Sequence, residues 1–482
     1  MGRLARVVRE TPETAVLALF SVWLARDRFR ITALYPDEAN RALVLYAHSW
    51  RTFRAVAFTD LGYTALLRVW MEFADHRAAV AVFPSIVAGA FCGPALCRWC
   101  RSVGLGRLAG FLAGLVLVCS NVQSDHVGSL KQYAWVTLMV IGLMHLATRA
   151  MAPEAPPRSA FVFAAAGALA VVVSALTLVP MVALLAIVGW RRRTERGVRA
   201  AVAGSTLVIV GFALAVVVPA MRSARQNLEL IGATVHLGDG PAAFGQLGER
   251  ARDLLYGLAP WSADLTRERA AGVAVGLLAV AGVIGLTRRR RADFAVAWLP
   301  VALALAGCVV GTVRLGSRAD TYLYPGLAAL AGAGIERIGR PVFARWHAAI
   351  PVVGFAAVIA AGATIESLPY PAVVPSYSAL ARSLDAVTAT TRIELTGVNP
   401  VGFLWESRWR VELEGRMPGY LWMRGRFVER CIRIIGSDDY FVNNGQRSAC
   451  IVRAGPMGDG WRVDAEPIEC SDEVSARIPQ GP

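Results

Sequence analysis

Two adjacent carboxylates, Asp37 and Glu38, stand in the segment LYPDEAN at residues 34–40, directly after the first apolar stretch of the chain. Charged side chains beside hydrocarbon are costly, so a pair of acids at the exit from a membrane segment is a candidate for acid–base chemistry or ligand binding. The alternative is a solvated loop that begins a helix, because Pro36 followed by acidic residues is also a typical helix start. The rest of the chain decides between these two interpretations.

The composition places the acidic pair at a membrane. The chain has 482 residues, of which 55% are hydrophobic and only 18% charged, which is too apolar for an average soluble protein. The formal charge of +15 comes largely from arginines in short clusters between apolar runs, a pattern that sets membrane topology and indicates no nucleic-acid partner. The chain contains a single lysine, Lys131. We therefore expect a polytopic α-helical protein of the cell membrane.

Apolar runs near the length that crosses about 30 Å of hydrocarbon, roughly 20 residues, are bounded by arginines along most of the chain. We count about 11 transmembrane helices and a short apolar helix at 62–73. The expected spans lie near residues 7–25, 76–99, 108–119, 131–146, a tight pair within 160–190 that turns near 174–180, 200–219, 272–286, 294–313, 322–335 and 348–364. The first run lacks a small-residue cleavage site and is interpreted as an uncleaved signal-anchor.

Nearly every basic cluster then falls on one side of the membrane, which predicts a cytoplasmic N-terminus. Polar loops at residues 120–129 and 314–320, and a long one at 221–269, fall on the outer face with the acidic pair. Basic and aromatic residues alternate between about 38 and 60, which favours helices lying in the interface.

From about residue 366 the chain becomes polar for more than a hundred residues, enough for a small extracytoplasmic α/β or α+β domain. We expect a helix at 376–388 and strands near 392–395, 409–413, 431–435, 449–453 and 461–465. The predicted domains are therefore 1–365, which spans the membrane, and 366–482.

The cysteines fall into two groups. Cys97 and Cys100 form a CxxC without a second pair, so they are interpreted as small apolar residues rather than zinc ligands. Cys431, Cys450 and Cys470 lie in the predicted outer domain, where oxidation is possible, and we expect two of these three to pair.

Three outer segments taken together carry a resemblance: YPDEA after the first span, SDH followed by KQYA, and RLGSRADTYLYP before a late span. This set resembles the GT-C superfamily of membrane glycosyltransferases, in particular the bacterial relatives of protein O-mannosyltransferases and the aminoarabinose transferase that modifies lipid A. The resemblance covers residues 7 to about 364 and implies a GT-C-like catalytic domain. It also implies a sugar donor carried on a polyprenyl phosphate, and transfer on the outer face to a lipid, glycan or protein hydroxyl of the cell envelope.

The resemblance assigns roles to individual residues. An inverting transfer needs a carboxylate that takes the proton of the acceptor hydroxyl, and Asp37 receives this role. The leaving polyprenyl phosphate is stabilised by cations where water is scarce, which suits Lys131, Arg314 and Arg318 at the outer ends of spans.

The remaining candidates have less defined roles. Glu38, Asp125 and His126 could hold the acceptor or a divalent metal ion. The open alternatives are that Lys131 and Arg318 only anchor helix ends and that His126 is a solvated loop residue. Tyr322 and Tyr324 are interpreted as part of an aromatic belt rather than as sugar-stacking residues.

Two other classes of protein compete with this hypothesis. A transporter or flippase would line its path with charges, but none of the middle spans carries a charge at its centre. A non-catalytic scaffold that presents the outer domain would leave the acidic pair unexplained.

Overall fold

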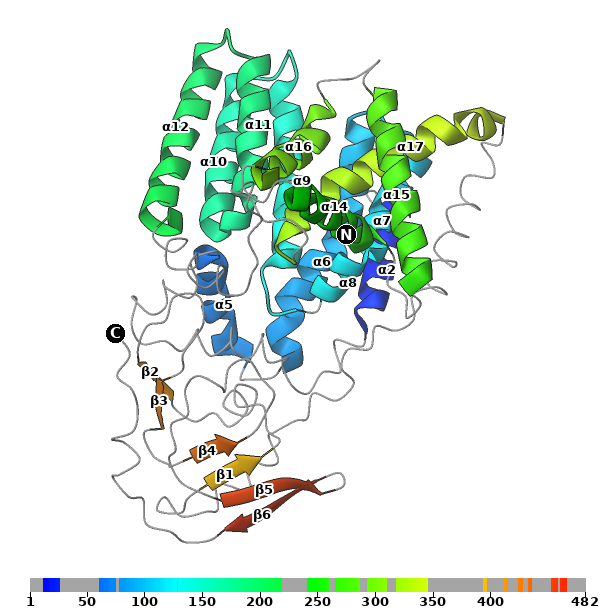
Figure 1. Cartoon of the computed structure of the whole chain (residues 1–482). Coiled ribbons are helices and arrows are strands. Elements are labelled where there is room, and N and C mark those ends of the chain that lie inside the picture. The colour runs from blue at the N-terminus through cyan, green and yellow to red at the C-terminus, as the bar shows by residue number, and fades with distance from the viewer. Residues whose placement is uncertain are drawn as a thin grey trace, which may run out of the picture. The chain divides into compact units, whose positions relative to one another are not determined.

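The computed structural model describes residues 12–26, 60–74, 78–127, 129–218, 241–259, 265–286, 293–309 and 318–345, together with six strands between residues 393 and 465 (Figure 1). The chain divides into two compact units. The first unit comprises Met1–Arg28, Val82–Pro219 and Leu228–Pro369, and the second comprises Phe29–Ala81, Ala220–Asn227 and Tyr370–Pro482. The domain boundary expected between residues 365 and 366 stays a prediction.

The described part of the first unit is helical. Its elements are α2 Pro12–Leu24, α6 Ala78–Ser102, α7 Arg107–Cys119, α8 Asn121–Val127, α9 Tyr133–Met151, α10 Pro157–Val173, α11 Leu178–Arg191, α12 Arg196–Phe212, α14 Pro241–Leu258, α15 Leu265–Leu286, α16 Ala295–Val309 and α17 Tyr324–Arg345. Two short 3-10 helices, η2 Ala175–Thr177 and η5 Arg318–Tyr322, and a π-helical segment that continues α12, η3 Ala213–Val217, complete the set. The start of α6 belongs to the second unit.

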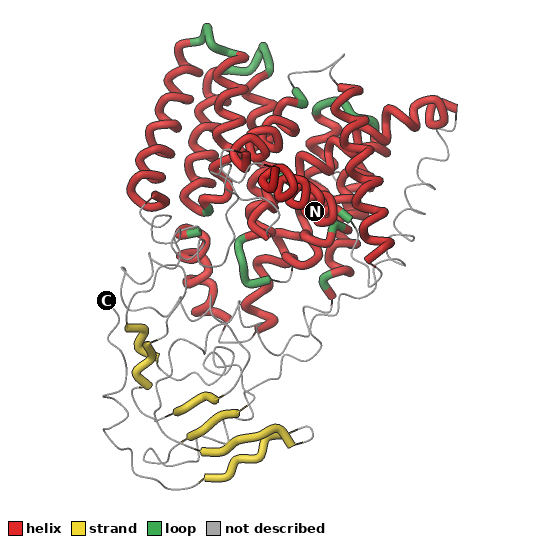
Figure 2. The backbone as a smooth tube through the Cα atoms, viewed as in Figure 1, coloured by secondary structure: helices red, strands yellow, loops and turns green. Residues whose placement is uncertain are grey.

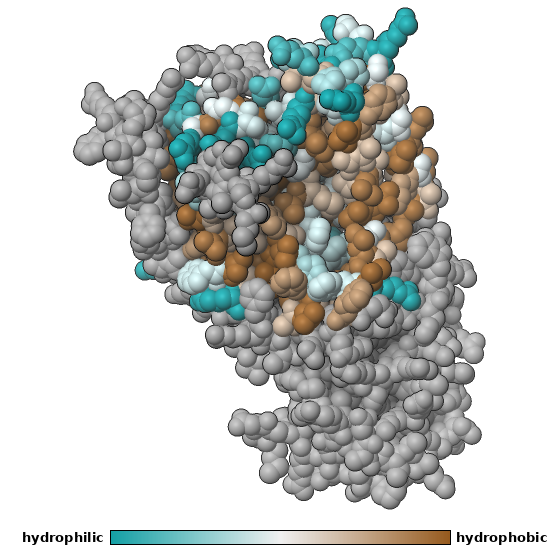
Figure 3. Space-filling model, turned by 180° about the vertical axis from the view of Figure 1, so that it is seen from behind, coloured by the Kyte–Doolittle hydropathy of each residue, from teal (hydrophilic) through white to brown (hydrophobic). Residues whose placement is uncertain are grey.

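Four of the described helices are long and apolar enough to cross a membrane. They cover Ala79–Ser102, Tyr133–Met151, Arg196–Val216 and Thr266–Gly285, and five shorter apolar helices accompany them. On the face that Figure 3 shows, apolar side chains cover the middle of the described part, and most hydrophilic side chains gather toward its upper end. The expected positions of the spans therefore agree with helices wherever the structure describes them. The expected span at 348–364 lies outside the described residues, so the count of about 11 stays a prediction.

The tight pair of helices expected within residues 160–190 is confirmed. Helix α10 ends at Val173, η2 makes one tight turn, and α11 begins at Leu178. The backbone amide and the side-chain hydroxyl of Thr177 both donate to the carbonyl of Ser174, at 3.0 Å and 2.9 Å, which holds the turn together. The chain therefore turns at residues 175–177, within the range of 174–180 in which the turn was predicted.

The turn between α6 and α7 depends on Gly104, whose φ of 84° lies in the left-handed region. The amide of Gly104 donates to the carbonyl of Arg101 and the amide of Leu105 donates to the carbonyl of Cys100, both at 3.0 Å. This is the hydrogen-bond pattern of a Schellman motif, in which glycine tolerates the backbone conformation that other residues avoid.

Arg192 joins two basic turns, between α9 and α10 and between α11 and α12, at one end of the first unit. The buried guanidinium of Arg192 donates to the carbonyls of Ala150 at 2.9 Å and Ala155 at 2.7 Å, and it also pairs with Glu195. The α9–α10 and α11–α12 turns are thereby tied together, and Figure 2 shows them side by side at the upper end of the helices.

A second group of contacts joins α2, α7 and α17. Glu13 at the start of α2 forms an ion pair of 2.5 Å with Arg107 and lies 3.9 Å from Arg101. The amide of Gly106 donates a hydrogen bond of 2.8 Å to the carboxylate of Glu336 on α17. The first described helix therefore begins at the same end as the basic turn between α6 and α7.

Helices α15 and α17 pack very closely against each other. A Cβ atom at Gly334 would overlap the carbonyl oxygen of Leu278, and one at Gly282 would overlap that of Leu330. Small residues let two membrane helices bring their backbones together, and dispersion contacts then hold them because hydrocarbon offers no hydrophobic driving force between helices.

The prediction of one long loop at residues 221–269 is wrong over part of that range. Residues Pro241–Leu258 form α14, and α15 already begins at Leu265. The segment was interpreted as a loop because its composition is polar, but it forms an amphipathic helix. Leu254 and Leu258 are buried on one face of this helix, and Glu249 and Arg252 are exposed. Residues 219–240 and 260–264 lie outside the described residues.

The second unit contains α5 Leu61–Ala74 and the six strands β1 Ile393–Thr396, β2 Val411–Glu414, β3 Arg424–Phe427, β4 Ile432–Ile435, β5 Val452–Met457 and β6 Gly460–Ala465. Four strands form a mixed sheet in the order β4-β1-β5-β6, in which β1 is parallel to β4 and β5 while β6 is antiparallel to β5. Strands β2 and β3 form a separate antiparallel pair. Four of the expected strands overlap observed ones closely, β5 is shifted toward its hairpin with β6, and β3 was not predicted.

Candidate active site

The segment SNVQSDHV, expected to be a solvated outer loop, forms the short helix α8. Ser120 ends α7 and begins α8: its hydroxyl donates to the carbonyl of Leu117 at 2.7 Å and accepts a hydrogen bond from the amide of Gln123 at 3.2 Å. This is helix N-capping by serine. A seven-residue helix made mostly of polar residues shows no clear hydrophobic period, which explains the incorrect loop prediction.

His126 is buried, not solvated, with only 1% of its surface exposed. Its ring lies 4.3 Å, centroid to centroid, from the ring of Tyr133 at the start of α9. The amino nitrogen of Lys131 lies 5.9 Å from the centroid of the same tyrosine ring. Tyr133 therefore links His126 of the SDH segment to Lys131 of the KQYA segment.

The RAD segment joins these two through η5, which contacts both α8 and α9. Asp320 is 1% exposed and Thr321 is fully buried. The amide of Leu323 donates a hydrogen bond of 2.9 Å to the carbonyl of Asp320 as the turn leads into α17. The aromatic-belt interpretation of Tyr322 and Tyr324 is wrong, because both side chains are buried inside the first unit.

Five buried polar residues from these three segments form what we call the buried polar cluster: Gln123, His126, Gln132, Asp320 and Thr321. Among the described residues, no hydrogen-bond partner is present for Oε1 of Gln132 or Oγ1 of Thr321, whereas the side chain of Gln123 faces the thiol of Cys92. Buried polar atoms are costly without partners and are almost always paired in native proteins. The two unsatisfied atoms, in neighbouring elements, therefore call for a polar partner such as a water molecule.

Helices α14 and α15 hold α8 in position. The amide of Asn121 donates to the carbonyl of Ala259 at 2.7 Å, and its side-chain nitrogen donates to the carboxylate of Glu268 at 3.0 Å. The carboxylates of Asp320 and Asp253 both lie close enough to the hydroxyl of Tyr324 to interact with it electrostatically. The residues around the cluster thus come from five separate stretches of the chain.

The cluster lies at the end of α9 opposite the basic turns. Lys131 and Gln132 directly precede the first residue of α9, whereas Thr148, near the other end of this 19-residue helix, is hydrogen-bonded to Trp99. At 1.5 Å per residue the helix is about 28 Å long, close to the thickness of a bilayer core.

The predicted site residues fall into three groups. Lys131 and His126 lie at the cluster with described side chains. Asp125 lies on α8 and Arg318 begins η5, so their backbones are at the cluster, while their side chains are outside the described set. Asp37, Glu38 and Arg314 lie outside the described residues.

Sequence analysis missed four members of the cluster: Gln123, Gln132, Asp320 and Thr321. Asp320 did carry a signal, because it is an acid placed two residues after Arg318 at the mouth of a span. The two glutamines and the threonine are uncharged and have no distinctive spacing. Their burial became visible only in the tertiary structure.

The described residues contain no group of three or more His, Cys, Asp or Glu side chains that could hold a metal ion. Asp37, Glu38 and the side chain of Asp125 lie outside the described residues. The interpretation of Cys97 and Cys100 as apolar core residues agrees with the structure, in which both are fully buried free thiols.

This arrangement is suited to binding an anionic, polar molecule at the edge of a membrane. The ammonium group of Lys131 forms charge-assisted hydrogen bonds with anions such as phosphate. The amide, hydroxyl and imidazole groups of the cluster supply donors and acceptors for neutral polar groups. A carboxylate in such a place, that of Asp320, either orients a donor or accepts a proton.

The fold is shared with two solved structures of one membrane protein. The chain is similar to ArnT from Cupriavidus metallidurans in the apo state, with 13% sequence identity over 91% of this chain and 87% of that chain and a TM-score of 0.53. It is also similar to the same protein bound to undecaprenyl phosphate, with 13% identity over 90% and 87% and a TM-score of 0.54. No family model matches the chain, and no curated protein sequence is similar to it. The likeness at this identity shows the fold, and the resemblance predicted from the three outer segments is confirmed at that level.

Proposed function

We propose that the chain transfers a sugar from a polyprenyl-phosphate donor to an acceptor hydroxyl of a lipid, glycan or protein. The transfer takes place at the outer face of the cytoplasmic membrane. The observation that carries this proposal is the meeting of the SDH, KQYA and RAD segments at the buried polar cluster. These segments carried the resemblance to GT-C glycosyltransferases, and they lie far apart in the sequence.

The proposed donor site uses cations around the cluster. Lys131 lies beside Tyr133 with its amino group at the start of α9, and Arg318 begins η5. Together with Arg314 they would bind the phosphate of the donor and stabilise the negative charge that develops as the sugar leaves. The similar ArnT structure bound to undecaprenyl phosphate supports this class of lipid as the donor carrier.

The proposed chemistry is an inverting displacement. Asp37 takes the proton of the acceptor hydroxyl while the oxygen of that hydroxyl attacks the anomeric carbon of the sugar, and the bond to the polyprenyl phosphate breaks. Glu38, Asp125 and His126 would hold the acceptor or a divalent metal ion near the attacking oxygen. A metal, if bound, would neutralise phosphate charge.

A deletion strain provides the first test. Mass spectrometry of its envelope should show loss of one sugar from a glycolipid or glycoprotein and accumulation of the matching polyprenyl-phosphate sugar. Restoration by the wild-type gene but not by Asp37→Asn would support the role of the carboxylate, since asparagine keeps the size of the side chain but cannot accept a proton.

A second test measures the rate of sugar transfer by the purified protein in proteoliposomes that contain the donor lipids extracted from the deletion strain. We expect Asp37→Asn to lower turnover roughly 10²-fold to 10⁴-fold with donor binding retained. Glu38→Gln should lower turnover less than Asp37→Asn does. Transfer by Asp37→Asn at the wild-type rate with saturating donor would reject Asp37 as the base and make Asp125 the next residue to test. Movement of the intact lipid-linked sugar across the bilayer without transfer would instead identify a flippase.

A further inference from the structure

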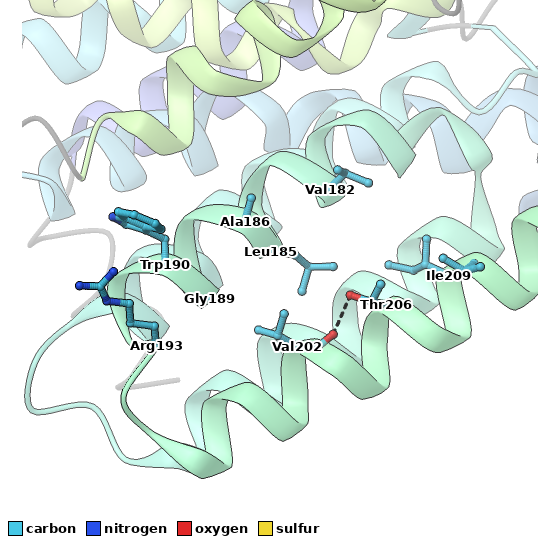
Figure 4. Close-up of a pocket in the computed structure, with 10 residues that line it drawn as sticks. Val182, Leu185, Ala186, Gly189, Trp190, Arg193, Val202, Thr206 and Ile209 are labelled. Carbon is cyan, nitrogen blue, oxygen red and sulfur yellow. Dashed lines mark hydrogen bonds between the residues drawn. The ribbon is translucent and has the colours of Figure 1, made fainter.

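An apolar groove runs between α11 and α12, from Val182 and Val210 to Trp190 and Arg193 at the end that carries the basic turns. Its volume is about 500 Å³ and its walls include Leu185, Val202 and Ile209 (Figure 4). Thr206 also lines it, but its hydroxyl donates a hydrogen bond of 2.8 Å to the carbonyl of Val202 and is therefore satisfied within α12. The walls thus offer a mostly hydrocarbon surface.

The groove exists because α12 packs mainly on α10 and only loosely on α11. The hydroxyl of Ser205 donates to the carbonyl of Ala164 on α10 at 3.1 Å, which holds the two helices together. Only 22% of the membrane-crossing window of α12 is buried, and Leu207 and Val208 on it are exposed. In a membrane protein such a helix faces lipid, so the groove opens toward the acyl chains of the bilayer.

The end of the groove carries an aromatic ring and a cation. Trp190 is 73% exposed, and the guanidinium carbon of Arg193 lies 4.9 Å from its ring centroid, a cation–π geometry (Figure 4). Exposed tryptophans are typical of the boundary between acyl chains and head groups. The groove therefore has an apolar body and a positively charged mouth.

The charge at this mouth is not cancelled by the neighbouring acid. The carboxylate of Glu195 pairs with Arg192, which is buried and occupied by the α9–α10 turn. Arg193 instead lies in the open with three other exposed arginines of the same turn, at positions 191, 196 and 199. The turn as a whole thus attracts anions.

We propose that this groove binds an acyl chain of an anionic phospholipid, whose phosphate lies against Arg193 and Trp190. The charge complementarity between the arginines and a phosphate head group selects an anionic over a zwitterionic lipid. Arg192 ties this turn to the α9–α10 turn, so a lipid bound here would stabilise the end of the helix bundle at which both turns lie.

This lipid site is separate from the proposed donor site. The buried polar cluster adjoins the start of α9, whereas the mouth of the groove, at Trp190 and Arg193, lies beside the turns at the other end of this helix, which is about 28 Å long. The inference does not depend on the proposed sugar transfer.

Native mass spectrometry of the purified full chain tests the proposal, with phosphatidylglycerol and phosphatidylcholine as probes. The wild type should retain one phosphatidylglycerol more tightly than phosphatidylcholine. Arg193→Gln should weaken that binding about tenfold, the loss expected for one charge-assisted hydrogen bond. Arg158→Gln is the matched control, because Arg158 is also exposed beside the α9–α10 turn but does not line the groove.

A second variant blocks the apolar body without changing charge. A Cβ atom at Gly189 would stand 3.6 Å from Val202, an ordinary van der Waals distance, so Gly189→Leu can fill the groove while the helix is kept. We expect it to release phosphatidylglycerol although Arg193 is intact, and the melting temperature of each variant checks that it is folded. Equal phosphatidylglycerol binding in the wild type, Arg193→Gln and Gly189→Leu would overturn the proposal. So would equal retention of phosphatidylcholine, or displacement of the bound phospholipid by undecaprenyl phosphate at equal concentration.

Discussion

The indole nitrogen of Trp99 donates a hydrogen bond of 3.0 Å to the hydroxyl of Thr148, and Trp99 itself is fully buried. Trp99 lies near the end of α6 and Thr148 near the end of α9, so this contact brings the two helix ends together. The thiol of Cys92, earlier on α6, lies 3.6 Å from the carbonyl oxygen of Ala134 at the start of α9, so α9 runs in the same direction as α6. The basic turns after both helices consequently share one end, as the arginine pattern predicted.

This relationship leads to a topology prediction. With the native cysteines replaced, a single cysteine at Thr194 in the α11–α12 turn should be protected in intact cells from a thiol probe that cannot cross the membrane. A cysteine at Ser437 should be labelled, because the chain after residue 366 is expected outside. Labelling at Thr194 with protection at Ser437 would invert the orientation and reject transfer at the outer face.

Lys131 should matter through its charge if it binds the donor phosphate. Lys131→Gln should weaken donor use by about 1.5 to 3 kcal/mol, which is roughly tenfold or more, since a hydrogen bond to a charged group is lost. Lys131→Arg should retain a larger part of the activity. Steady-state transfer in proteoliposomes at varied donor concentration measures both.

Arg318→Gln is expected to behave like Lys131→Gln, and Arg158→Gln, at the far end of the helices, serves as the control for a general loss of positive charge. Unchanged donor affinity and turnover in both Lys131→Gln and Arg318→Gln would assign these side chains to anchoring at the interface.

The ring of Tyr133 is predicted to position Lys131, because it is near both the amino group of Lys131 and the ring of His126. Tyr133→Leu removes the ring and should raise the KM for the donor by roughly twofold to thirtyfold, the range for a cation–π contact, with less effect on kcat. Tyr133→Phe keeps the ring and should keep most of the donor affinity.

A double-mutant cycle separates positioning from general damage to this region. If the ring acts through the amino group, Lys131→Gln should cost less in the Tyr133→Leu background than in the wild type. Fully additive losses would show that Tyr133 does not act through Lys131.

The close crossing of α15 and α17 should be intolerant of a single methyl group. Gly334→Ala places a Cβ where the carbonyl oxygen of Leu278 already lies, and the backbone cannot rotate away as a side chain can. We expect a loss of about 1 to 3 kcal/mol, as for other overpacked sites, seen as a lower melting temperature in detergent.

Gly142→Ala on α9 is the matched control, because no described atom lies within 4 Å of the added Cβ. Its melting temperature should be unchanged or slightly raised, since alanine favours a helix over glycine. Equal stability of the two variants would show that the α15–α17 crossing is looser than the structure describes.

The amino-acid sequence by itself determined where the membrane helices lie. Crossing a bilayer requires a long run of apolar residues, and the arginines that bound each run mark its ends, so this information is local. The same local information located the turn after Val173. It failed at α8 and α14, because short or polar helices lack a strong apolar run and their buried faces depend on which neighbours cover them.

Only the tertiary structure decided what the polar segments do. Tyr322 and Tyr324 were predicted to meet the membrane interface, and the open alternative for His126 was a solvated loop residue, but all three side chains are buried. Gln123, Gln132 and Thr321 carry no charge or spacing that distinguishes them in the sequence, yet they gather with Asp320 around one site. Contacts between segments nearly two hundred residues apart depend on how the helices pack, and no local pattern encodes that packing.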